Sequence, residues 1–179
     1  MIDSCEKRSP FSQSLKGNKM IKSTSKLTEL GSQTTISEIM SRSTFTVEPK
    51  DSVQSALRIM VDQVNTLPVV DENRRCVGII SRTDLSESFY AEDKELARFV
   101  NVEGVGYSSF PSSKVDTCDE RRVYELMNDN VIVATTSMTI VDACELMTES
   151  MIHHLPVVDE KNKLIGMVSS FDIVRWLVS

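Results

Sequence analysis

The chain has 179 residues, of which 40% are hydrophobic and 26% are charged, and its net charge at pH 7 is −6. The four cysteines lack the close spacing of a zinc site or a disulfide framework, and no apolar run reaches the roughly 18 residues that a membrane-spanning helix needs. Phosphate neutralisation needs clustered Lys and Arg, so the acidic balance disfavours nucleic acid as the main partner. We therefore expect a globular cytoplasmic protein without a resident metal or cofactor.

Residues 1–33 predict a disordered tail. They are rich in Ser, Thr and Lys and show no apolar period. The mild basicity of this stretch is more typical of a solvated tail than of a targeting segment. We expect ordered structure from Thr34 onward.

Two later stretches of the chain repeat each other. Leu67–Asp84 reads LPVVDENRRCVGIISRTD and Leu155–Asp172 reads LPVVDEKNKLIGMVSSFD, with nine of the 18 positions identical. The repeat extends upstream, where the offset between copies changes from 88 to 87 residues because the first copy is one residue shorter before Leu67. Two units are too few for an open solenoid, so we expect one pseudo-symmetric body with a cleft between equivalent surfaces.

The first unit opens with a predicted helical turn at Ile36–Met40 and a brief strand at Thr44–Val47, which Pro49 ends. A helix follows, with Asp51 or Ser52 as its cap. Its apolar side chains recur at helical spacing and form one stripe, made of Val53, Ala56, Leu57, Met60 and Val61.

Two strands and a helix complete the first unit. The strands are predicted at Leu67–Val70 and Cys76–Ser81, joined by the polar turn Asp71–Arg75, and their runs of Val and Ile indicate burial on both faces. Another helix begins near Asp84 and could extend over Leu85–Val100. The element order of the unit is therefore β-α-β-β-α.

The second unit predicts the same order. Its elements are a strand at Val131–Ala134, a helix from Thr139 with Ile140, Ala143, Cys144 and Met147 inward, strands at Leu155–Val158 and Leu164–Ser169, and a last helix from Asp172. Between the units, Asn101–Asp119 reads as a long loop, and loops of this length are usually functional or mobile. We place the first repeat at residues 34–90, the linker at 91–122 and the second repeat at 123–179.

Each unit carries a Ser-x-x-Asp sequence where a strand ends and a helix begins, at Ser81–Asp84 and at Ser169–Asp172. A capping box explains both, with the serine and the aspartate satisfying each other's backbone N–H groups. A binding role is compatible with capping. The helix start can hold phosphate while the carboxylate accepts two hydrogen bonds from a ribose diol.

Taken together, the A-x-x-x-M helix, the LPVVD strand and the G-h-h-S-x-x-D junction, each present twice, resemble a tandem pair of cystathionine-β-synthase (CBS) domains, a Bateman module. The resemblance covers about Ile36–Ser179 and implies an α+β fold in which two β-α-β-β-α repeats pack with pseudo-twofold symmetry. It also implies adenosine-type ligands (AMP, ADP, ATP, S-adenosylmethionine or NAD) in the clefts between repeats, a homodimer of two modules, and no catalysis.

The resemblance further implies which residues bind the nucleotide. Asp84 and Asp172 match the ribose-binding aspartate, Ser81 and Ser169 the hydroxyl before it, His153 a position facing phosphate from the opposite repeat, and Thr44 and Val131 the edges that contact adenine through backbone. Thr83 adds a hydroxyl that Phe171 lacks. We expect Ser81, Thr83, Asp84 and His153 to converge on one cleft that binds more tightly than the second, which combines Ser169 and Asp172 with Asn65.

Metal binding and catalysis are not expected. His153 and His154 are adjacent at the start of a strand and should point to opposite faces, which prevents both from binding one ion. No recognisable nucleophile or phosphate-loop motif is present. Two functions remain open: a nucleotide sensor that regulates a separate partner protein, and a ligand-free interaction or dimerisation module. Both repeats keep the hydroxyl and the carboxylate together, which favours the sensor.

Overall fold

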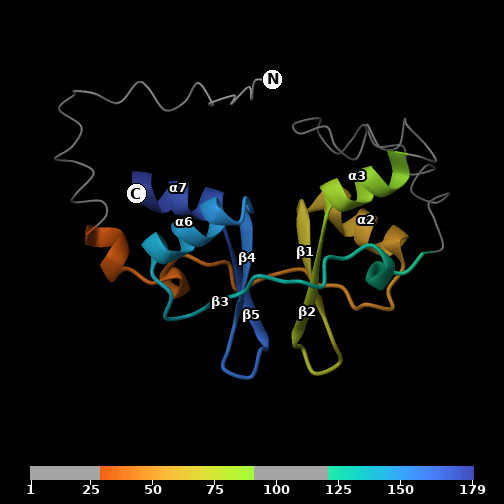
Figure 1. The fold of residues 1–179 in the computed structure, drawn as a ribbon, viewed down its shortest axis with the longest axis horizontal. Coiled ribbons are helices and arrows are strands. Elements are labelled where there is room, and N and C mark those ends of the chain that lie inside the picture. Colours follow the sequence, from red (N-terminus) through yellow and green to blue (C-terminus); the bar gives the residue numbers. More distant parts are fainter. Residues whose placement is uncertain (1–28, 91–120) are drawn as a thin grey trace, which may run out of the picture.

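The computed structural model describes residues 29–90 and 121–179, which form two similar halves side by side (Figure 1). The first half contains α2 (Val53–Asp62), β1 (Thr66–Val70), β2 (Cys76–Ser81) and α3 (Arg82–Tyr90). The second contains β3 (Ala134–Thr135), α6 (Ile140–Glu149), β4 (His154–Val158), β5 (Leu164–Ser169) and α7 (Ser170–Val178). Short 3-10 helices, η2 (Ile36–Glu38) and η4 (Val123–Glu125), precede them. The predicted α+β fold with two repeats is confirmed.

Helix α2 begins where the apolar spacing predicts. Ser52 is its N-cap because its side chain accepts a hydrogen bond from the Ser55 amide, whereas Asp51 accepts one from the Glu48 amide. Four residues of the predicted stripe are buried, namely Val53, Ala56, Leu57 and Met60. Val61 is only partly buried.

The hairpin of the first half is antiparallel, with Thr66 opposite Ser81. Its turn is closed by Asp71, whose carboxylate accepts hydrogen bonds from two backbone amides of the turn. Strand β1 is buried from Leu67 onward, but alternate residues of β2 are only partly buried. Burial on both faces was therefore a wrong expectation for β2, because Ile79 and Ser81 border a cavity.

The second half repeats the hairpin and the helices, and the two halves differ at their first strand. Strand β3 is shorter than the predicted strand Val131–Ala134 and lies later in the chain, where it pairs in parallel with β4. The equivalent strand of the first half, predicted at Thr44–Val47, is reduced to a single parallel bridge between Val47 and Val69.

The segment that precedes each half packs on the other half. Ile36 and Met40 lie in the core of the second half, and Val123 lies in the core of the first. Backbone contacts also join each of these segments to the opposite half. Ser41 forms a β-bridge with Met167, and Asn128 forms one with Ile79. Figure 1 shows both segments crossing between the halves. The turn predicted at Ile36–Met40 therefore precedes the first half along the chain but packs on the second half in space.

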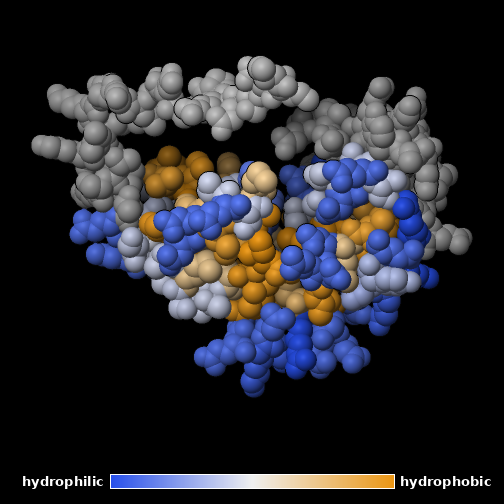
Figure 2. Space-filling model, in the orientation of Figure 1, coloured by the Kyte–Doolittle hydropathy of each residue, from blue (hydrophilic) through white to orange (hydrophobic). Residues whose placement is uncertain are grey.

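The hairpin ends meet at the pseudo-twofold axis. The Cys76 amide donates to the Asn162 carbonyl over 3.0 Å, and the equivalent Leu164 amide donates to the Arg74 carbonyl over 2.9 Å. A small apolar cluster joins the halves there, made of Val70, Cys76, Val158 and Leu164. Figure 2 shows hydrophobic residues along this central seam and hydrophilic residues below it. The paired contacts agree with the predicted pseudo-twofold symmetry.

The repeated glycines allow the exchanged segments to approach the strands. A Cβ at Gly166 would lie 2.7 Å from the Ser41 carbonyl oxygen, and one at Gly78 would lie 2.5 Å from the Met127 sulfur. The Ser41 backbone is fixed because its amide donates to the Met167 carbonyl and its carbonyl accepts from the Met167 amide, each over 2.9 Å. The side chain of Met127, in contrast, can rotate away.

We therefore expect Gly166→Ala to destabilise the fold by about 1–3 kcal/mol, and Gly78→Ala to cost clearly less. At about 2–4 °C per kcal/mol for a chain of this size, thermal unfolding followed by circular dichroism would resolve the difference. Equal losses in both variants would contradict this account of the close backbone approach.

The predicted boundary between the tail and the first repeat lies too far toward the C-terminus. Residues 29–33, which were assigned to the tail, are helical, and a Cβ at Gly31 would lie 3.1 Å from Val141 Cγ2 and 3.8 Å from the Trp176 ring. These residues therefore pack on the second half. The predictions for residues 1–28, for the helix beyond Tyr90 and for the loop Asn101–Asp119 lie outside the described residues.

The extra residue of the second repeat is Met151. It follows α6, takes a left-handed backbone conformation with φ of 53°, and is 86% exposed. The additional residue therefore bulges outward at the end of α6. The residues before and after it follow the same path as the equivalent residues of the first half. This is why Ile152 and His153 occupy the positions of Val64 and Asn65 in the first half.

Candidate functional site

The first candidate position is the start of α3. The Asp84 Oδ2 atom accepts hydrogen bonds from both the amide and the hydroxyl of Ser81, each 2.7 Å long. The Ser81 hydroxyl oxygen in turn accepts from the Asp84 amide over 3.3 Å. The capping box predicted at Ser81–Asp84 is therefore present. Among the described residues, the second oxygen, Oδ1, has no hydrogen-bond or ion-pair partner.

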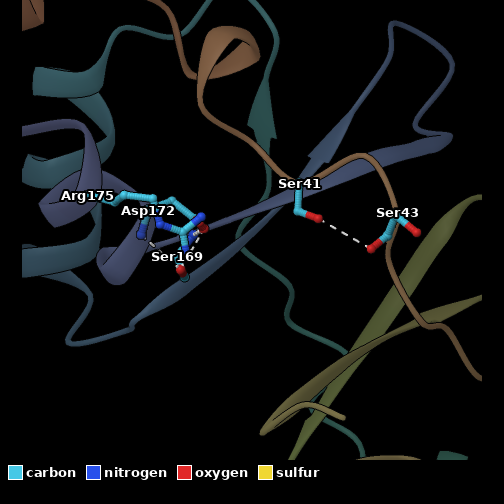
Figure 3. Close-up of polar contacts among 5 residues, drawn as sticks. All are labelled: Ser41, Ser43, Ser169, Asp172 and Arg175. Atoms are coloured by element: carbon cyan, nitrogen blue, oxygen red, sulfur yellow. Dashed lines mark hydrogen bonds and ion pairs between the residues drawn. The ribbon is translucent and has the colours of Figure 1, made fainter. Parts of the chain in front are cut away.

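The second candidate position, at the start of α7, has the same capping geometry. Asp172 Oδ2 accepts from the Ser169 amide at 2.8 Å and from its hydroxyl at 2.6 Å. Its other oxygen differs from that of Asp84, because Asp172 Oδ1 lies 3.9 Å from Arg175 Nη1 (Figure 3). The two aspartates are therefore equivalent as helix caps and unequal as acceptors for a ligand.

A cavity of about 750 Å³ lies between the halves. Four predicted residues, Ser81, Thr83, Asp84 and His153, line it together. The rest of its lining comes from both halves and consists of Asn65, Thr66, Ile79, Arg82, Asn128, Asn130, Ile132, Ile152, His154, Ser169, Ser170 and Phe171.

This lining corrects the expected division into two clefts. Asn65 and Ser169 were assigned to a second cleft with Asp172, yet both line the same cavity as Asp84, whereas Asp172 is not among the described residues that line it. The pseudo-twofold axis passes near this point, so equivalent residues of the two repeats, Asn65 and His153, border one space.

Thr44 and Val131 do not line the cavity, although the chain near Val131 does. Asn128, Asn130 and Ile132 face the cavity, while Val131 packs against the apolar cluster between the halves. In extended backbone, alternate residues point to opposite sides. The expected adenine contacts of Thr44 and Val131 are made through backbone and stay predictions, whereas the asparagines were missed because they lie before the predicted strand. Thr44 instead donates a 3.4 Å hydrogen bond to the Ser41 carbonyl.

His154 and Thr66 meet across the axis, and both were missed as cavity residues. They are equivalent positions of the two repeats, and His154 Nδ1 lies 3.4 Å from Thr66 Oγ1. Burial lowers the pKa of His154 and the neighbouring His153 lowers it further, whereas Asp172 opposes these effects. The imidazole is therefore neutral at pH 7 and offers one donor and one acceptor.

His153 lies just before β4 and His154 begins it, and both residues line the cavity. Over the part of the chain that the structure describes, no group of three or more His, Cys, Asp or Glu side chains is placed to hold a metal ion. Within the same residues, no helix is long and apolar enough to cross a membrane.

Curated relatives share most of this chain. An uncharacterized protein of Methanocaldococcus jannaschii is 27% identical over 153 residues, which are 80% of this chain and 90% of the relative. The chloroplastic CBS domain-containing protein CBSX2 of Arabidopsis thaliana is 31% identical over 72% of this chain and 56% of its own length. Inosine-5'-monophosphate dehydrogenase of Methanocaldococcus jannaschii is 28% identical, but the chain spans only 22% of that enzyme.

Two of the solved structures with similar folds were determined with adenosine-type ligands. CBSX2 in complex with AMP is 30% identical, with a TM-score of 0.61 over 81% of this chain and 96% of that one. A CBS domain pair in complex with 5-methylthioadenosine and S-adenosyl-L-methionine is 25% identical, with a TM-score of 0.62 over 81% of this chain and 96% of that one.

A family model of the CBS domain matches the chain twice, at residues 36–90 and 123–179. The two matches contain the repeated units recognised in the sequence, and each includes the exchanged segment that precedes its half. Because the matched residues make up more than half of the chain, it belongs to the CBS-domain family and carries a tandem pair of CBS domains.

Proposed function

We propose that this chain is a regulatory sensor that binds an adenosine-type nucleotide at the Asp84 end of the cavity. The observation that carries the proposal is Asp84 Oδ1, a carboxylate oxygen on the cavity wall that no described residue engages. Asp84 Oδ2 orients the group through its two hydrogen bonds from Ser81. The carboxylate is therefore held in place while one oxygen is left to accept hydrogen bonds from a ribose diol.

The surroundings of Asp84 suit the other parts of a nucleotide. Thr83 and the start of α3 offer a hydroxyl and a positive helix end to phosphate, and the exposed His153 faces them from the other half. Apolar side chains for an adenine ring come from Ile79, Ile132 and Ile152. The cavity volume of about 750 Å³ lies within the range of small-molecule sites.

The solved relatives support the ligand class, since one contains AMP and another contains 5-methylthioadenosine with S-adenosyl-L-methionine. We infer that the module reports ligand binding to a separate partner protein, that it has no catalytic activity of its own, and that it works in the cytoplasm. The dehydrogenase relative does not alter this proposal because the chain covers so small a share of it.

A thermal-shift series tests the proposal. AMP, ADP, ATP, S-adenosylmethionine and NAD would each be added to the full chain, with GMP and inorganic phosphate as controls. A ligand at 100 times its Kd stabilises the folded state by about 2.7 kcal/mol. We expect the best adenosine ligand to raise Tm by about 5–10 °C. If none of the five shifts the transition, the sensor proposal fails and the interaction module takes its place.

We also expect a homodimer. Helix α7 exposes apolar side chains at helical spacing, with Phe171 66%, Val174 52% and Val178 81% exposed, and such a face favours self-association. Light scattering of the 20.1 kDa chain should give about 40 kDa. Val174→Glu should shift the mass to a monomer, whereas Tyr124→Glu, at an exposed residue of η4, should not. A monomeric wild type at micromolar concentration would contradict this expectation.

A further inference from the structure

The cavity wall carries a permanent positive charge at a residue that the sequence did not single out. Arg82 is the only arginine or lysine among the described residues that line the cavity, and Asp84 is the only carboxylate among them. The equivalent residue of the second repeat is Ser170, which also lines the cavity but has no charge. A ligand in the cavity therefore meets one fixed cation and one carboxylate, both at the start of α3.

The Arg82 side chain is positioned by the C-terminal end of α2. Its Nη2 atom donates a hydrogen bond to the Met60 carbonyl oxygen. In the second half, the equivalent Met147 carbonyl accepts a hydrogen bond from the Ile152 amide over 2.9 Å. A guanidinium has five N–H donors, so it can hold a carbonyl and still donate to a phosphate. The end of α2 therefore orients the guanidinium at the edge of the cavity.

The neighbourhood of Arg82 favours an anionic group. Arg82 is the first residue of α3, and the amino end of a helix carries a partial positive charge. The residue is partly buried, so salt screens its charge less than that of an exposed arginine. From the other half, His154 adds no charge at pH 7, because burial lowers its pKa. The wall suits a ligand that presents an anion to Arg82 and a diol to Asp84.

We infer that Arg82 selects the phosphate-bearing members of the adenosine class, so that the cavity binds AMP or ADP in preference to adenosine or 5-methylthioadenosine. A phosphate ester carries nearly two negative charges at pH 7, and the other two ligands have no phosphate. A hydrogen bond to a charged group is worth about 10- to 100-fold in an equilibrium constant, and an exposed ion pair about two- to fivefold. For a partly buried arginine we expect about tenfold. This inference rests on the proposed function and narrows its ligand class.

Isothermal titration calorimetry on the full chain tests the inference with AMP and adenosine, which differ only in the phosphate. The wild type should bind AMP at least tenfold more tightly than adenosine. Arg82→Gln should weaken AMP about tenfold and change adenosine less than twofold, and Arg82→Lys, which keeps the charge, should keep part of the preference. Arg58→Gln makes the same charge change on the exposed side of α2 and should leave both affinities unchanged.

The ratio of the two affinities separates specificity from a structural role, because Arg82→Gln also removes the contact with Met60 and should lower the ligand-free Tm. An arginine that only supports the fold would weaken AMP and adenosine by the same factor, which would overturn the inference. The wild type gives a second measurement that needs no variant. Higher salt should weaken AMP and leave adenosine unchanged, and equal salt dependence would contradict the inference.

Two further outcomes concern the cause and the proposed function. If Arg58→Gln weakened AMP as much as Arg82→Gln does, net charge rather than the arginine on the cavity wall would be the cause, and the inference would fail. Equal affinities for AMP and adenosine in the wild type would overturn the inference and leave the nucleotide sensor intact. A wild type that binds no adenosine-type ligand would overturn both.

Discussion

Asp84→Ala should remove most of the nucleotide-dependent rise in Tm, which we expect to be about 5–10 °C in the wild type. The substitution deletes the carboxylate oxygen on the cavity wall that we propose as the acceptor for the ribose. It also deletes the capping contact with Ser81, so the ligand-free Tm should fall by a few degrees, since a capping residue contributes about 0.5–2 kcal/mol. The measurement is thermal unfolding with and without saturating AMP.

A matched variant separates binding from capping. Asp142 forms the same capping box with Thr139 at the start of α6, where its Oδ2 accepts the Thr139 hydroxyl at 2.7 Å, and it does not line the cavity. Asp142→Ala should therefore lower the ligand-free Tm to a similar extent and keep the full rise with AMP. Asp172→Ala should keep most of the rise. A full rise in Asp84→Ala would place the nucleotide elsewhere.

Ile36→Ala should cause the largest loss of stability. Ile36 is fully buried in the core of the second half, although it precedes the first half in the chain. Truncating a buried isoleucine to alanine costs about 2–5 kcal/mol, which corresponds to a fall in Tm of about 5–15 °C for a chain of this size. Thermal unfolding gives the magnitude, and hydrogen exchange shows which half is weakened.

The pattern of amide hydrogen exchange is the sharper test of whether η2 and η4 each stabilise the opposite half. Ile36→Ala should reduce amide protection first in α6, β4 and β5, whereas Val123→Ala should reduce it first in α2, β1 and β2, because Val123 lies in the core of the first half. Loss of protection in α2 and β1 as the first effect of Ile36→Ala would mean that η2 belongs to its sequence neighbours.

Local structure was largely predictable because its signals are local. The apolar stripe from Val53 to Met60 specified α2, and the continuous apolar runs with a polar turn specified β2 and β5 at their observed bounds. The Ser-x-x-Asp spacing located both strand-to-helix junctions, since a capping box needs only residues three apart, although α3 and α7 begin at Arg82 and Ser170, slightly before the predicted starts. The internal repeat then indicated that the two sets of elements are equivalent.

The sequence-based predictions fail where contacts between distant parts of the chain determine the structure. Only the packed structure shows that η2 and η4 exchange halves, because Ile36 and Val123 lie in apolar segments that would suit either core. The face of the chain near Val131 follows from its bridge between Asn128 and Ile79, which a one-residue shift would reverse. His154 and Thr66 meet only because the axis brings equivalent residues together.

By itself, the sequence determined the duplication, the hairpin and the main helices of each repeat and the two capped aspartates, all of which follow from residue spacing along one segment. The tertiary structure decided that both repeats border one cavity, and that Asp84 keeps an oxygen unengaged by described residues while Asp172 faces Arg175. The physical reason is that capping depends on the three preceding residues, whereas the availability of a carboxylate oxygen depends on every side chain that folding brings within reach of it.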